Sequence, residues 1–229
     1  MGYSETEIIE MCDAAWMNIP VFYKADCINY RGKTSDTDRH YSEVIAEYIV
    51  NRAEEFKRGI PTITREGSYD VKHDGSYREG TNRDEEVIAI KMFNQGRNKP
   101  YACIGTIIDY QTPLKNSRDD KAGKIDLLAF DGNLLRVLEL KKPDSKETML
   151  RCVLEGFTYL RTVDQEKLKR DFDIPLEAKV TASPFVFYDG DQYREWKEGR
   201  KMLTRLMTEL DSVPFFIEEQ GGNYVVRED

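Results

Sequence analysis

The chain has 229 residues, enough for one sizeable domain or for one domain with an added subdomain. Its net charge of −8 argues against a protein that coats nucleic acid through bulk charge, but it leaves room for an enzyme that binds nucleic acid through a local patch. No apolar run reaches the length of a membrane span and no signal peptide is evident, so we expect a cytoplasmic protein outside the membrane.

Residues 1–80 read as an N-terminal helical extension or subdomain. Ser4 and Glu7 form a capping-box pattern ahead of a short helix, a second helix is predicted over 37–57, and Asp74-Gly75 is a hairpin signal. The four cysteines are scattered and indicate buried thiols. Three roles stay open for this part: covering one end of a sheet, shaping a substrate channel, or forming a homodimer.

Residues 81–229 read as an α/β core that ends in a helix and a hairpin. The predicted elements are a helix over 83–94 capped by Asn82, strands over 101–110, 124–130 and 134–141, a helix capped by Asp144 or Ser145 and running to Arg161, a strand over 180–188, a helix over 191–210, and a hairpin of 215–218 with 224–226. From residue 82 the order is helix, three strands, helix, strand, which predicts a mixed sheet with helices on both faces.

Carboxylates stand on two of these strands where apolar residues are expected. Side chains alternate along a strand, so Glu139 and Lys141 share one face of the apolar strand over 134–141. If Gly132-Asn133 form the turn, Asp126 lies directly opposite Glu139; if Asp131-Gly132 form it, the two are diagonal neighbours. Both registers place the two carboxylates within reach of one ligand.

Two half-buried anions that face each other repel and lose hydration, and a divalent cation would offset both costs. Mg²⁺ takes oxygen ligands and keeps several waters, so Asp126, Glu139 and a backbone carbonyl suffice. Lys141 could orient or deprotonate an attacking water, or stabilise charge that develops on a phosphate. The alternative is a structural salt bridge from Lys141 to Asp126 or Glu139.

The stretches Gly123–Leu128 and Val137–Lys141, an acidic residue followed by Glu-x-Lys, resemble the PD-(D/E)xK nuclease superfamily, whose fold is restriction-endonuclease-like. The resemblance covers about residues 82–188. It implies an α-β-β-β-α-β core and Mg²⁺- or Mn²⁺-dependent cutting of phosphodiester bonds, with DNA favoured over RNA. Asp126, Glu139 and the Leu140 carbonyl would bind the metal, and Lys141 would position the water.

The resemblance also implies further site residues. Relatives add a glutamate from the first core helix, here Glu86 or Glu85, and we favour Glu86 because it shares a face with Ile90 and Phe93. The helix after Glu-x-Lys carries Glu155 and Tyr159 where some relatives have Gln and Tyr. Substrate contacts are expected from basic residues around the motif and from this tyrosine, namely Lys124, Lys142, Lys146, Arg151 and Tyr159. The alternative is an inactive nuclease-like fold that serves as a nucleic-acid-binding or assembly module.

Overall fold

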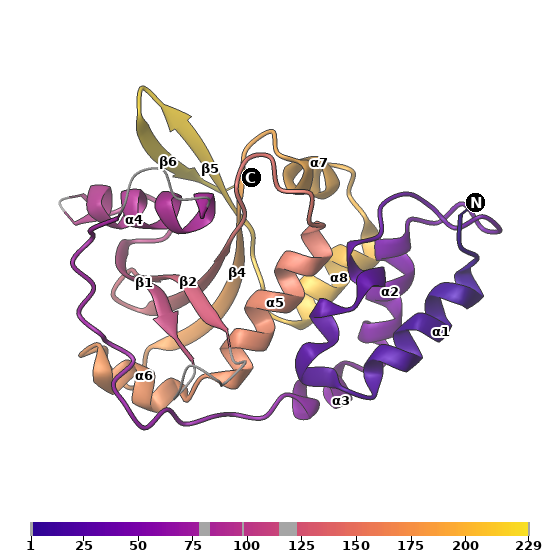
Figure 1. Cartoon of the computed structure of the whole chain (residues 1–229), viewed down its shortest axis with the longest axis horizontal. Helices are drawn as coiled ribbons and strands as arrows, with labels where there is room; N and C mark the ends of the chain where they lie inside the picture. The colour runs from indigo at the N-terminus through magenta and orange to yellow at the C-terminus, as the bar shows by residue number, and fades with distance from the viewer. Residues whose placement is uncertain (1, 78–82, 98, 115–122, 229) are drawn as a thin grey trace.

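The computed structural model describes residues 2–77, 83–97, 99–114 and 123–228 and contains one curled, six-stranded mixed sheet in the order β1 to β6 (Figure 1). The strands are β1 (Thr106–Pro113), β2 (Lys124–Phe130), β3 (Leu134–Leu140), β4 (Lys179–Phe187), β5 (Phe215–Gln220) and β6 (Asn223–Arg227). Strands β1, β2 and β3 are antiparallel neighbours, β3, β4 and β5 are parallel, and β6 closes the sheet as an antiparallel hairpin with β5.

Helices cover both faces of the sheet, as the sequence predicts. Helix α4 (Asp84–Gly96) packs on one face, and α5 (Met149–Thr162) packs on the other (Figure 1). The remaining core helices are α6 (Gln165–Asp171), α7 (Asp191–Lys197) and α8 (Lys201–Glu209). None of the helices in the described part of the chain is both long and apolar enough to cross a membrane.

The N-terminal part is helical, with α1 (Glu5–Trp16), the 3₁₀ helices η1 (Ile19–Lys24) and η2 (Asp26–Asn29), α2 (Tyr41–Val50) and α3 (Ala53–Gly59). The capping box is confirmed, because Ser4 Oγ accepts from the Glu7 N–H and the Glu7 carboxylate accepts from the Ser4 N–H. The single helix over 37–57 is wrong, since a turn at Asn51–Arg52 splits it. The hairpin at Asp74-Gly75 is also wrong, because residues 71–77 form no strand.

Several core boundaries differ from the sequence-based expectation for local reasons. Asn82 lies outside the described residues. β1 starts at Thr106 because residues 101–105 fold back into a small turn closed by Tyr101 and Gly105. The charged stretch after α5 contains α6. Gly199, with a φ of +65°, divides the expected helix over 191–210 into α7 and α8.

The helix after β3 starts later than the sequence suggests. Its N-cap is Thr148, not Asp144 or Ser145, because the Thr148 hydroxyl accepts from the Arg151 N–H at 3.1 Å. The same hydroxyl donates to the Ile28 carbonyl at 2.7 Å, and Asn29 Oδ1 accepts from the Thr148 N–H. The N-terminal part therefore holds the start of α5 directly.

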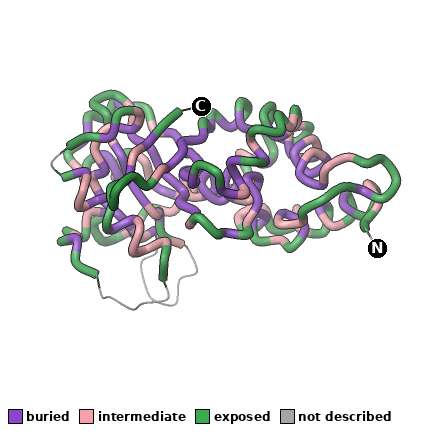
Figure 2. Tube along the Cα trace, turned by 90° about the horizontal axis from the view of Figure 1, so that it is seen from above, coloured by how far each residue is buried: buried purple, intermediate pink, exposed green. Residues whose placement is uncertain are grey.

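The N-terminal helices and the sheet share one continuous apolar core. Phe56 of α3 stacks on Phe157 of α5, and buried residues of α1 and α2 belong to the same cluster as those beneath α5 and α8. In Figure 2 buried segments occur both in the sheet and in these helices. The N-terminal part is thus packed onto the core rather than tethered to it.

Thr148→Val tests this attachment. The substitution keeps the shape but removes the helix cap and leaves the Ile28 carbonyl without its donor, so we expect a loss of about 2–3 kcal/mol in the free energy of unfolding measured with urea. Thr204→Val, at an exposed position of α8, is the matched control and should change it by less than about 0.5 kcal/mol. Equal losses in both variants would contradict the role given to Thr148.

Candidate active site

The hairpin of β2 and β3 places the two strand carboxylates opposite each other. Leu127 pairs with Leu138 and Phe130 with Leu135, so the register expected from a Gly132-Asn133 turn is confirmed, and Gly132 takes a positive φ of 103°. One residue beyond the last ladder pair, the same register brings Asp126 to Glu139. There the ladder opens, because the Leu140 N–H donates to Asp126 Oδ2 at 3.0 Å instead of to a strand carbonyl.

Asp126 is half-buried, and hydrogen bonds hold both of its carboxylate oxygens. Its Oδ1 accepts from Gln111 Nε2 at 3.0 Å, and Gln111 adopts a left-handed φ of 48° near the end of β1. Such strained backbone is concentrated at functional sites. Burial raises the pKa of Asp126 to about 7, and the positive charge of Lys141 opposes only part of this shift. Near neutral pH the protonated and the ionised forms of this carboxyl group are therefore both populated.

Glu139 is the most deeply buried of the described carboxylates that line the site. Its Oε1 lies 2.7 Å from Lys141 Nζ, whereas its Oε2 is buried with no hydrogen-bond partner among the described residues. Burial raises its pKa well above the ordinary range despite Lys141. Gly156 of α5 makes the fit close, because a β-carbon there would lie 3.3 Å from that of Glu139. An unpaired, buried carboxylate oxygen is costly and requires an explanation.

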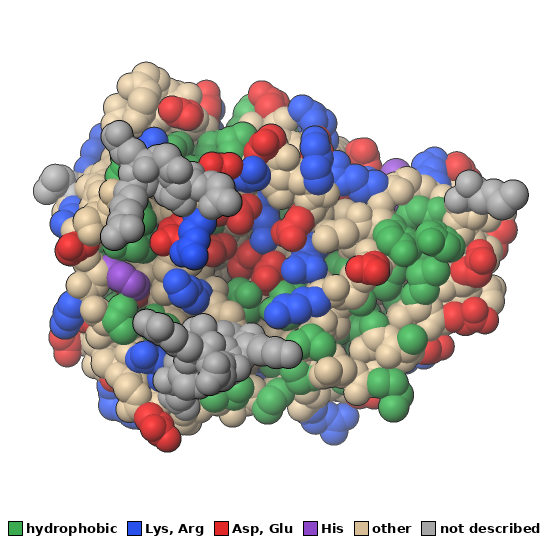
Figure 3. Space-filling view, viewed as in Figure 1, with side chains coloured by type: hydrophobic (Ala, Val, Ile, Leu, Met, Phe, Trp, Pro, Cys, Tyr) green, Lys and Arg blue, Asp and Glu red, His purple; other side chains and the backbone are tan. Residues whose placement is uncertain are grey.

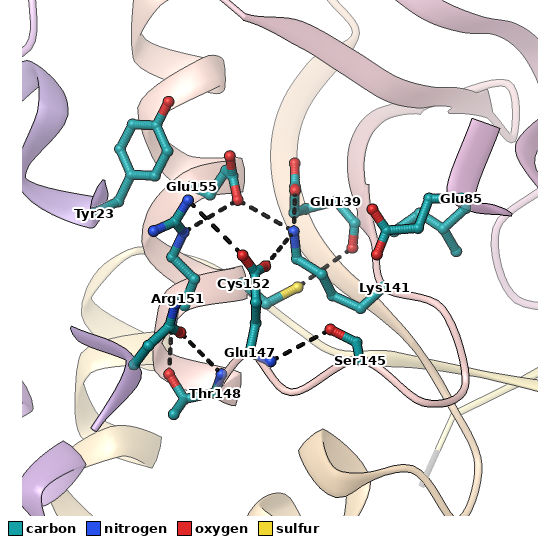
Figure 4. Close-up of polar contacts among 12 residues, drawn as sticks. Tyr23, Glu85, Glu139, Lys141, Ser145, Glu147, Thr148, Arg151, Cys152 and Glu155 are labelled. Atoms are coloured by element: carbon teal, nitrogen blue, oxygen red, sulfur yellow. Dashed lines mark hydrogen bonds and ion pairs between the residues drawn. The ribbon is translucent and has the colours of Figure 1, made fainter. Parts of the chain in front are cut away.

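Lys141 lies at the centre of three carboxylates (Figure 4). Its Nζ is 2.7 Å from Glu139, 2.8 Å from Glu147 and 3.1 Å from Glu155. Burial alone would lower the pKa of Lys141, but the charges of Glu139 and Glu155 outweigh it and raise the pKa above its ordinary value. The amine is therefore held as a cation, and a neutral lysine that takes a proton from water is disfavoured.

These residues line one hollow of about 560 Å³, visible as a cluster of acidic and basic side chains in Figure 3. All the expected side chains of the motif and of the substrate path lie along it, namely Asp126, Glu139, Lys141, Lys124, Lys142, Lys146, Arg151 and Tyr159. Leu140 takes part through its backbone N–H. The hollow thus brings together residues from β2, β3, α5 and the loop between β3 and α5.

The structure places Glu85, and not the favoured Glu86, along the hollow. Glu86 pairs with Arg83 at 3.2 Å on its own helix, whereas Glu85 lines the hollow and accepts from the Lys142 N–H at 3.1 Å. The start of α4 lies against Lys142, just after β3, and helical periodicity alone cannot predict this placement. The negative charge of Glu85 is one of the causes of the raised pKa of Asp126.

Three partners of the site have no sequence signal. Glu147 reaches Lys141 from a loop, Gln111 reaches Asp126 from β1, and Tyr23 of η1 carries the Arg151 guanidinium over its ring at 4.9 Å. All three depend on how distant segments pack. Glu155 was visible as a helix residue after Glu-x-Lys, and the structure gives it a partner in Lys141 and another in Tyr159, whose hydroxyl donates to it at 3.0 Å.

No protein-family model, curated protein or solved structure matches the chain. Within residues 2–77, 83–97, 99–114 and 123–228, no three or more His, Cys, Asp or Glu side chains are arranged as a ready-made metal site. Any function proposed for the chain therefore rests on the residues and geometry of the hollow.

Proposed function

We propose that the chain is a metal-dependent nuclease that hydrolyses phosphodiester bonds, with DNA favoured over RNA. The observation that carries the proposal is the buried Oε2 of Glu139, which has no hydrogen-bond partner in the described part of the chain, next to Asp126, whose pKa is raised to about 7. Both carboxylates are short of positive charge, and both offer the hard oxygen donors that Mg²⁺ and Mn²⁺ prefer. The order α4, β1, β2, β3, α5, β4 supports a restriction-endonuclease-like core.

The side chains present fit a metal ion in part. Glu139 and Asp126, with the Leu140 carbonyl, would hold it, and Glu85 is a further carboxylate that lines the hollow and acts on Asp126. A bound divalent ion would supply Lewis acidity toward the phosphodiester. Each Asp126 oxygen accepts one hydrogen bond, and each keeps a further lone pair with which it could bind a metal ion.

Lys141 acts as a fixed positive charge in this proposal. Its ammonium group is oriented by three carboxylates and is well placed to stabilise negative charge that develops on the phosphate during cutting. The basic residues Lys124, Lys142, Lys146 and Arg151 lie along the same hollow and would contact the flanking phosphates. This local cluster reconciles a nucleic-acid substrate with a net charge of −8.

The test is a cutting assay on labelled linear duplex, circular and single-stranded DNA and on RNA, with Mg²⁺, Mn²⁺ or EDTA. We expect metal-dependent cutting that Glu139→Gln abolishes, because the new amide removes the charge but not the shape. Glu166→Gln, the same change on the exposed side of α6, should cut like wild type. No cutting by wild type on any substrate, or equal cutting by all three proteins, would count against a nuclease.

A second function is favoured by the lack of a ready-made three-ligand metal site among the described residues. In that case the hollow binds nucleic acid or a partner without cutting, and Lys141 with its three carboxylates is structural. Titration calorimetry separates the two functions. Mn²⁺ binding that Glu139→Gln removes supports the nuclease, whereas absence of Mn²⁺ binding supports the inactive binding module.

A further inference from the structure

A second hollow, of about 190 Å³, opens beside the candidate active site. The N-terminal part supplies one wall through Val21, Tyr23 and Ile63, and α5 supplies the opposite wall through Tyr159. Gly123 closes it at the start of β2. Because most of the lining is aliphatic or aromatic, the hollow suits an apolar, flat group better than a charged one. We call it the side pocket.

The side pocket shares a wall with the active-site hollow. Tyr159 lines both, and its hydroxyl donates to Glu155, which in turn contacts Lys141. Gly123 lines the side pocket while the next residue, Lys124, lines the active-site hollow. A β-carbon on Gly123 would lie only 2.4 Å from the Tyr159 hydroxyl, so glycine lets β2 approach this ring. One side chain thus separates the side pocket from the catalytic groups.

Aromatic rings and cations meet where the two hollows join. The rings of Tyr23 and Tyr159 lie edge to face with centroids 6.0 Å apart. Arg151 lies 4.9 Å and Lys24 5.2 Å from the centre of the Tyr23 ring, and Figure 4 shows Tyr23 on the N-terminal segment facing Arg151 and Glu155. Proteins that hold single strands combine such rings for the bases with cations for the backbone.

The size of the side pocket limits its occupant. A volume of 190 Å³ is below the roughly 300–1,000 Å³ of pockets for drug-sized ligands, so it takes one small ring system rather than a peptide segment or a base pair. The neighbouring hollow offers cations to the phosphates of the same strand. A nucleobase in the side pocket would contact the apolar walls, while the phosphate attached to it would contact the cations of the active-site hollow.

We propose that the side pocket holds one unstacked nucleobase of the strand whose phosphate lies in the active-site hollow. The inference rests on the proposed function and narrows its substrate. A base inside an intact duplex is stacked on both sides and cannot enter unless it is extruded, at a cost of a few kcal/mol. The preferred substrate is therefore a single strand, or a duplex end or lesion where a base is already free.

The test measures binding of fluorescein-labelled single-stranded DNA by anisotropy in EDTA, where cutting cannot interfere. An abasic residue is placed at each position of the strand in turn. We expect one position at which the missing base lowers affinity about 10-fold, because that base loses its stacking on aromatic side chains. Val21→Trp, at a 40% exposed rim position, fills the side pocket and should lower the affinity for the intact strand similarly.

The decisive result is the combination of the two changes. In Val21→Trp the abasic residue should not lower the affinity further, because the tryptophan already excludes the base from the side pocket. Val213→Trp, at a 55% exposed position in a separate hollow near α8, is the matched control and should behave as wild type.

Binding that no abasic position weakens, or equal behaviour of the two tryptophan variants, would overturn the base pocket and leave the proposed cutting intact. Absence of single-strand binding also overturns the base pocket. If the protein nevertheless cuts duplex DNA with a metal ion, the nuclease proposal stands by itself.

Discussion

Lys141→Met is expected to lower the metal-dependent cutting rate by a factor of about 10²–10³, the usual effect of removing one positioned charge or donor at a reacting centre. Methionine keeps the length of the buried side chain but cannot offset charge on the phosphate. Initial rates at saturating Mg²⁺ measure the loss. Lys142→Met, the same change one residue along at the rim, removes a cation that pairs with Asp84 and would contact a flanking phosphate, not the charge at the reacting centre, and should cost a few-fold at most.

The same variant separates a catalytic role from a purely structural one. Without the ammonium, burial acts on Glu139 unopposed, so its pKa rises further and the folded protein binds a proton more tightly than the unfolded chain. The stability of Lys141→Met should therefore fall as the pH rises from 5 to 8. If the variant is folded at pH 6 and cuts there at the wild-type rate, Lys141 is a structural cation and the proposed role is wrong.

The hairpin that carries this site is predictable from local sequence because each of its determinants is local. Alternation fixes the face of Glu139 and Lys141, and the Gly132 turn fixes the register with Asp126. The strand ends over 124–130 agree with the structure residue for residue, since the largely apolar sequence stops at a turn on one side. Two of the motif's carboxylates can thus be placed opposite each other from the sequence alone.

What the sequence could not supply depends on the angles between elements. The placement of Glu85 instead of Glu86 in the hollow follows from how the start of α4 lies against Lys142. Tyr23 enters from an N-terminal part that carries no catalytic motif. Glu147 reaches Lys141 only because segments at both ends of the chain hold its loop, with Arg31 and Gln192 donating to its carbonyl. Neither periodicity nor propensity encodes such contacts.

Asp126→Asn is expected to abolish cutting and yet to stabilise the metal-free protein at pH 8. With a folded pKa of about 7 against an ordinary 3.8, Asp126 favours folding below pH 4 and progressively loses that contribution as the pH rises through 7. The difference corresponds to up to about 4 kcal/mol. The neutral amide does not carry this cost. In urea unfolding with EDTA present, the free energy of unfolding of Asp126→Asn should therefore exceed that of wild type by an amount that grows as the pH rises.

The control is the same substitution at Asp171, whose surroundings lower the pKa of the carboxyl group instead of raising it. Burial would raise the pKa of Asp171, but bonds from Lys167 Nζ at 2.7 Å and the Tyr69 N–H at 2.8 Å outweigh it and lower the pKa. Asp171→Asn should therefore be less stable than wild type at pH 8, with the gap closing toward low pH. If Asp126→Asn followed that pattern instead, the carboxylate would be satisfied without a metal ion. A stabilised but inactive Asp126→Asn would mean that Asp126 is kept for chemistry at the expense of stability.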